Sequence, residues 1–155
     1  MRSHLVSLFL LGLSFTSYGQ NVKVKAADGS ECATLPCVVA SVTLTDQSAG
    51  ASGVPFYTPA STGIFRISAY INTSTGTVQR AYWRLDLGWT DSGGPRSGSS
   101  ISQYLASGQN GFDSATLIAN DVGGQPLTYT ATPHGGGQGM GGMTYTLVLI
   151  VEQIQ

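Results

Sequence analysis

Chemistry in this sequence would have to centre on His134, the one histidine that follows residue 20, or on scattered aspartates. His134 begins the segment PHGGGQGMGGM, whose His-Gly-Gly-Gly run could form an oxyanion-binding loop. That chemistry needs a Gly-x-Ser-x-Gly nucleophile turn between a strand and a helix, and the sequence contains none. We therefore predict no catalytic site, and we interpret His134 and the glycine-rich residues 135–142 as a long hairpin loop.

The same loop has the Gly137-x-Gly139-x-x-Gly142 spacing of dinucleotide-binding loops. Those loops hold a pyrophosphate only where a helix N-terminus follows, and this one runs into a predicted strand near Met143. We therefore expect no nucleotide and no other cofactor. An alternative is that Met140 and Met143 make the loop an adaptable contact surface.

Four aspartates could in principle form a glycosidase pair or a calcium site: Asp86, Asp91, Asp113 and Asp121. They are singly spaced, without the clustered oxygen ligands that calcium requires, and Asp86 and Asp91 have opposite strand parity. We interpret all four as exposed turn and face residues and predict no metal site.

Arg66, Tyr70, Tyr82 and Arg84 fall on the outward parity of two strands that we expect to be neighbours, with Arg80 nearby. Together they could form an aromatic and cationic platform for a sugar or an acidic partner. Cross-strand pairing on a solvated sheet face is the alternative. Trp83 and Trp89 share the opposite parity, so we predict that they pack in the core.

The N-terminus is typical of an export signal. Arg2 precedes the apolar run Leu5–Leu13, and small residues at positions 17 and 19 favour cleavage before Gln20. The run is shorter than the ~20 residues of a membrane-spanning helix. We predict a signal peptide at residues 1–19, a single domain at residues 20–155, and a secreted or periplasmic product without an integral membrane segment; an uncleaved anchor is the alternative.

Export places Cys32 and Cys37 in an oxidising compartment, where their short separation permits a disulfide. Free thiols are the alternative, and zinc would need further ligands. Without Arg2 the chain has six basic and eight acidic residues, a net charge of −2. That balance gives no electrostatic footprint for nucleic acid.

Apolar residues alternate with a period of two, which indicates strands. The clearest runs are residues 63–72 and 81–89, and others span 36–45, 54–58, 99–106, 112–119, 126–132 and 143–154. These are about eight short strands separated by turn residues, with residues 90–98 as a loop. The pattern predicts an all-β fold, an antiparallel β-sandwich of the jelly-roll kind.

The last of these strands is apolar on both sides, because Val148 and Ile150 point away from the core face formed by Leu147 and Leu149. A strand that is apolar on both sides is usually buried on both sides. Either a loop or another subunit must then cover Val148 and Ile150, and we predict an oligomer contact there.

The segment YTPASTGIFRISA, residues 57–69, has an aromatic residue, a five-residue spacer, a glycine and an alternating strand. It resembles the same pattern in the trimeric jelly rolls of complement globular heads and tumour necrosis factor, and in uncharacterised bacterial and phage-type structural proteins. The resemblance implies a jelly roll and a trimer, with Gly63 serving a tight turn. It departs from complement proteins in lacking a collagen-like stalk and an aromatic-rich last strand.

We therefore expect an exported, non-enzymatic structural or adhesive module that associates with itself, with a trimer favoured. The alternative function is a carbohydrate- or ligand-binding domain that uses the outward Tyr and Arg face, with a carbohydrate or cell-surface partner. A nucleic-acid partner is not expected.

Overall fold

Eight strands make up the regular structure of the computed structural model, which describes residues 34–74, 81–101, 106, 108–135 and 142–155. Residues 1–19, on which we predict a signal peptide, and Cys32 lie outside that part of the chain. The strands are β1 (Cys37–Gln47), β2 (Ala51–Tyr57), β3 (Gly63–Ser74), β4 (Ala81–Asp91), β5 (Gly94–Ile101), β6 (Asn110–Asp121), β7 (Leu127–Gly135) and β8 (Thr144–Gln153).

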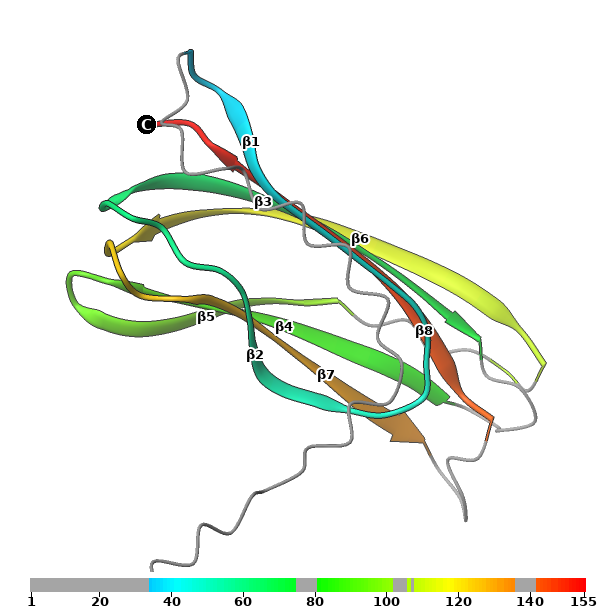
Figure 1. Cartoon of the computed structure of the whole chain (residues 1–155). Coiled ribbons are helices and arrows are strands. Elements are labelled where there is room, and N and C mark those ends of the chain that lie inside the picture. Colours follow the sequence, from blue (N-terminus) through cyan, green and yellow to red (C-terminus); the bar gives the residue numbers. More distant parts are fainter. Residues whose placement is uncertain (1–33, 75–80, 102–105, 107, 136–141) are drawn as a thin grey trace, which may run out of the picture.

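The strands form two four-stranded antiparallel sheets that lie face to face (Figure 1). Sheet A has the order β1-β8-β3-β6, and sheet B has the order β2-β7-β4-β5. Successive strands therefore change sheet at every step except β4 to β5. This is the Greek-key wiring of an eight-stranded jelly roll, and it confirms the predicted fold class. Over the described residues, no helix is both long and apolar enough to cross a membrane.

The core lies between the sheets and is filled by the inward-facing half of each alternating strand. In β3 and β4 the predicted inner faces are confirmed, because Ile67, Trp83 and Leu85 are each at most 1 % exposed. The Trp83 ring lies 4.5 Å from that of Tyr145 between centroids, so an aromatic contact joins the two sheets. Trp89 is partly buried and packs against the same core.

Residues 90–98, predicted as a loop, instead contain the end of β4, the hairpin turn and the first part of β5. Asp91 pairs with Gly94 across a two-residue turn. The Asp91 carboxylate accepts hydrogen bonds from the Gly93 N–H (2.7 Å) and from Arg96 Nε (2.7 Å). Gly94 has φ +112°, a conformation that side chains disfavour. Glycine-rich sequence thus marked a tight turn rather than the end of sheet structure.

Gly63 was expected to permit a tight turn, and its role is different. A Cβ at this position would lie 2.8 Å from the Gln155 carbonyl oxygen. The close approach allows Ile64 N–H to donate to that oxygen (2.8 Å) and Ile154 N–H to donate to the Ile64 carbonyl (2.9 Å). The glycine therefore fastens the chain segment after β8 to the start of β3.

Candidate functional site

The predicted Tyr and Arg platform is divided between the two sides of the molecule. Arg66 and Tyr70 are on β3 in sheet A, whereas Tyr82 and Arg84 are on β4 in sheet B. All four point outward, so each pair faces away from the other. The expectation that β3 and β4 are neighbours was wrong because consecutive jelly-roll strands usually cross to the opposite sheet.

The outer face of sheet B is polar and its side chains are paired with one another. The Tyr82 and His134 rings stack with centroids 4.9 Å apart and planes 9° apart. Arg84 forms an ion pair with Asp86 two residues along the same strand (2.9 Å). The β7 residues beside them at this face are Thr128, Thr130 and Thr132. His134 therefore belongs to β7, and our prediction that it lies in a loop was wrong.

The outer face of sheet A carries several large apolar side chains among polar ones. Val148 and Ile150 point outward from β8 and are half-buried, and their outward direction agrees with the alternation. Further apolar side chains lie on the same face, and of these the sequence singled out Tyr70 alone. Large apolar side chains are exposed on this face at Val38 (55 %), Tyr70 (37 %), Phe112 (67 %) and Ile118 (56 %). We call the outer surface formed by Val38, Tyr70, Phe112, Ile118, Val148 and Ile150 the apolar face.

The strand register explains why these residues gather. Tyr70 pairs with Val148 of β8, and Ser68 of the same strand pairs with Ile150. Phe112 pairs with Asn72 on the other side of β3, and the Phe112 and Tyr70 rings stack at 5.9 Å. The four strands of sheet A thus place these apolar residues on the same outer face, with small hydroxylated residues and the Arg66–Glu152 pair between them.

One ion pair lies within the apolar face. Arg66 Nε donates to Glu152 Oε2 at 2.6 Å across the β3–β8 ladder. This hydrogen bond, reinforced by the Arg66 charge, lowers the pKa of Glu152. The two charges cancel, so this part of the surface would present no net charge to an approaching copy of itself.

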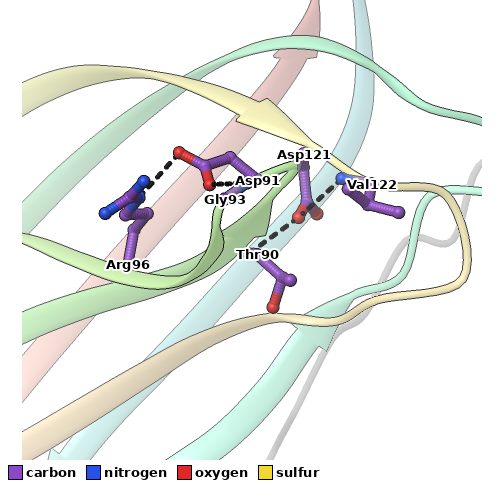
Figure 2. A network of polar contacts seen from close by, with 6 residues as sticks. All are labelled: Thr90, Asp91, Gly93, Arg96, Asp121 and Val122. Carbon is purple, nitrogen blue, oxygen red and sulfur yellow. Dashed lines mark hydrogen bonds and ion pairs between the residues drawn. The ribbon is translucent and has the colours of Figure 1, made fainter.

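Of the four aspartates that we interpreted as exposed turn and face residues, Asp121 does not fit that interpretation. Asp121, expected to be exposed, is fully buried at the end of β6 (Figure 2). Its Oδ1 accepts hydrogen bonds from the Thr90 N–H (3.0 Å) and from the Val122 N–H (3.1 Å). Burial raises the pKa of Asp121, and these two backbone bonds oppose that rise. In the described part of the chain, no three histidine, cysteine or acidic residues are grouped to hold a metal ion.

Asp121 ties the two sheets together at an end of the sandwich. The β4–β7 ladder stops at Gly88, so the backbone of Thr90 lies beyond its last β7 partner. The Asp121 side chain accepts from the Thr90 N–H, and the Thr90 carbonyl accepts from the Val122 N–H at 2.8 Å. Both backbone groups of Thr90 are therefore satisfied from sheet A.

The cysteines and methionines singled out in the sequence are only partly described by the structure. Cys37 opens β1, and because Cys32 lies outside the described residues the Cys32–Cys37 disulfide stays a prediction. Met143, considered as a contact residue of the glycine-rich loop, is buried in the core instead. Met140 lies outside the described residues.

Comparison with solved structures identifies the class of fold. The chain is similar to the globular domain of zebrafish complement 1qA protein, at 17 % sequence identity and a TM-score of 0.54, over 77 % of this chain and 97 % of that one. It also matches an infectious bursal disease virus (Gx strain) structure at 10 % identity and a TM-score of 0.45, over 96 % of this chain and 38 % of that one. No protein-family model and no curated protein matches the sequence.

The zebrafish likeness, together with the strand order, makes this chain a jelly-roll β-sandwich with the fold of the complement globular domain. The resemblance noted in residues 57–69 is thereby confirmed at the level of fold. At this sequence identity the likeness defines the architecture, and function has to be argued from the faces of the two sheets.

Proposed function

We propose that this chain is an exported, non-enzymatic structural or adhesive module that assembles with copies of itself through the apolar face. One observation carries the proposal. Five large apolar side chains are exposed among the described residues, and four of them, Val38, Tyr70, Phe112 and Ile118, lie on the outer side of sheet A. Sheet B exposes none of them on its outer side. Large exposed apolar side chains that gather on one face are typical of a protein contact site.

Burial of this face would be favourable because little on it needs water. Each exposed Phe or Ile that becomes buried contributes about 1.5–3 kcal/mol. The side chains between the apolar ones are small and hydroxylated, at Ser41 and Ser68, and can hydrogen-bond across a contact. The Arg66–Glu152 pair enters the contact already neutralised.

A closed ring of subunits fits a face of this shape. The exposed Phe112 and Ile118 belong to β6, which is the edge strand of sheet A, whereas Val148 and Ile150 lie towards its centre. An edge that docks on the central part of a neighbouring face makes a head-to-tail contact, and such contacts form a ring where the rotation between subunits closes. The resemblance of residues 57–69 to trimeric jelly rolls favours three subunits.

The mass of the protein in solution tests this proposal. Wild-type protein should have the mass of a small oligomer, and Ile150→Asp should reduce it to that of a folded monomer, because the carboxylate would be buried without a partner in a dry contact. Ile118→Thr should weaken association more mildly. The matched control is Thr132→Asp on the outer face of sheet B, which should leave the mass unchanged. A wild-type monomer at high micromolar concentration, or equal masses for Ile150→Asp and wild type, would contradict the proposal.

Export is a separate part of the proposal and has its own measurement. We expect the intact mass of protein recovered after secretion to begin at Gln20. Before reduction, the mass should be lower by two hydrogens because Cys32 and Cys37 form a disulfide. Retention of residues 1–19 would contradict the signal peptide, and an unchanged mass on reduction would contradict the disulfide.

A further inference from the structure

A polar hollow lies beyond the Tyr70 end of the apolar face, and the proposed assembly does not use it. It has a volume of about 250 Å³ and is lined by Asp46, Asn72, Ser74, Asn110, Thr144 and Thr146. The lining comes from all four strands of sheet A, and the register sets it in two rows. Thr144, Ser74 and Asn110 form one row, and Thr146 and Asn72 form the next.

The wall on the β1 side is built by an irregularity in that strand. The β1–β8 register shifts between Leu44 and Gln47, and Asp46 in this bulge has φ +52°. Asp46 is the single residue of the described part of the chain, other than glycine, with a positive φ. Bulges re-aim side chains next to functional sites, and a residue held in this conformation is worth explaining by function.

An aromatic platform lies next to the hollow on the β6 side. Phe112 pairs directly with Asn72 of the lining, and the residue is 67 % exposed. Tyr70 stacks against Phe112 with planes 26° apart and so supports it from the next row. Carboxamide, carboxylate and hydroxyl groups therefore lie beside an open, held aromatic ring.

We propose that this hollow is a binding site for a neutral saccharide. A sugar ring presents hydroxyl groups at its rim, which pair with the donors and acceptors of Asn72, Asn110 and Asp46. It also presents C–H groups on its face, which pack against the π-face of Phe112. Phosphate or sulfate groups do not fit, because the lining contains one carboxylate and no cation.

The site differs from the carbohydrate face predicted from the sequence. That prediction combined residues of β3 and β4, which the fold separates into two sheets. The hollow uses β1, β3, β6 and β8 instead, and of the predicted residues it includes Tyr70 alone as a support. It goes beyond the proposed assembly in the ligand that it binds. It shares Phe112 and Tyr70 with the apolar face, so a saccharide and a second subunit would compete for the Phe112 ring.

The test is binding of the fluorescently labelled full chain to a printed array of neutral oligosaccharides ending in glucose, galactose, mannose, fucose or N-acetylhexosamine. We expect binding to at least one of these groups, unchanged by EDTA because a single carboxylate lines the hollow. For the best ligand, Phe112→Ala and Asn72→Ala should each raise the dissociation constant per subunit about tenfold, because each variant loses one stacking or hydrogen-bonding group.

Tyr82→Ala is the matched control, since it removes an aromatic side chain from the outer face of sheet B. It should bind as wild type does. Thr146→Val removes one hydroxyl without changing volume, and it replaces Asn72→Ala if circular dichroism shows that variant to be misfolded. The proposal is overturned if no neutral saccharide binds, if Phe112→Ala and the hollow variant bind as tightly as wild type, or if Tyr82→Ala abolishes binding.

Discussion

The two sheets of this sandwich have equivalent inner faces and contrasting outer faces. Inside, β3 of sheet A and β4 of sheet B both contribute uninterrupted rows of buried apolar residues. Outside, sheet B has threonines, a Tyr82–His134 stack and an ion pair within one strand. Sheet A has exposed aliphatic and aromatic side chains around a cross-strand ion pair.

This contrast separates what the chain needs for folding from what it offers to partners. The inner rows are sufficient to hold the sheets together, so the outer face of either sheet could be polar. Sheet B follows that expectation, with a stacked pair of rings and an ion pair on its outer face. Sheet A retains apolar surface that contributes little to the fold of one subunit, which is why we place the contact there.

The largest expected effect tests the equivalence of the inner faces. Ile67→Asp in β3 and Leu85→Asp in β4 should each destabilise the subunit by on the order of 4 kcal/mol or more, because both side chains are completely buried. Chemical denaturation followed by tryptophan fluorescence, with mass by light scattering, measures this. Ile150→Asp is the comparison, and it should change mass but keep a cooperative transition. A well-folded Ile67→Asp variant would show that sheet A has no true inner face.

The next effect concerns the tie between the sheets. Asp121→Ala should lower the free energy of unfolding by about 1–3 kcal/mol, because it leaves the Thr90 N–H without its acceptor. Asp121→Asn is the matched variant, since its Oδ1 still accepts from the same N–H group. Equal denaturation midpoints for wild type and Asp121→Ala would exclude Asp121 as a tie.

The difference in stability between wild type and Asp121→Asn should depend on pH in a defined direction. The folded-state pKa of Asp121 is raised above its ordinary value of 3.8 by burial. The folded state therefore holds its proton more tightly, so wild type should gain stability relative to Asp121→Asn as pH falls through the raised pKa towards 3.8. Denaturation of both proteins from neutral pH to pH 3 measures the difference. A stability difference that does not vary with pH would contradict a raised pKa for the buried Asp121 carboxyl group.

The smallest effect compares the two outer ion pairs. Glu152→Gln should lower subunit stability slightly, and more than Asp86→Asn, because Arg66–Glu152 joins two strands whereas Arg84–Asp86 lies within one. The hydrogen bond from Arg66 lowers the pKa of Glu152 below 4.5. Its stabilisation should be present above pH 4.5 and disappear as pH falls through the lowered pKa, as measured by thermal midpoints. A larger loss of stability in Asp86→Asn than in Glu152→Gln would contradict the stronger contribution expected of the cross-strand ion pair.

Alternation in the sequence was enough to predict most of the strands and the inner faces of β3 and β4, but it missed the first part of β5 (Gly94–Ile101). Apolar residues repeat with a period of two at Phe65 and Ile67 in β3 and at Trp83 and Leu85 in β4. Each is buried, as that alternation requires. The outward direction of Val148 and Ile150 also followed from parity. Local patterning reports these features because a strand needs only its own residues to define two faces.

Features that depend on pairing between distant strands were not predictable. Parity shows that Arg66 and Arg84 face outward, but it does not say which sheet each strand joins. Asp121 looked like a turn residue because its burial comes from Thr90 of another strand. The hollow required the register of Asn72 with both Phe112 and Thr146, which no single strand encodes.

The position of β8 has a consequence for how the chain is made. This last strand of the described chain lies between β1 and β3, in the interior of sheet A. During synthesis from the N-terminus, β1 and β3 therefore wait for a partner that emerges after every other strand. We expect the nascent chain to remain open until Thr144–Gln153 is available, and then to close cooperatively. Late closure is compatible with the export that we propose, because a chain that stays open can cross a membrane before it folds.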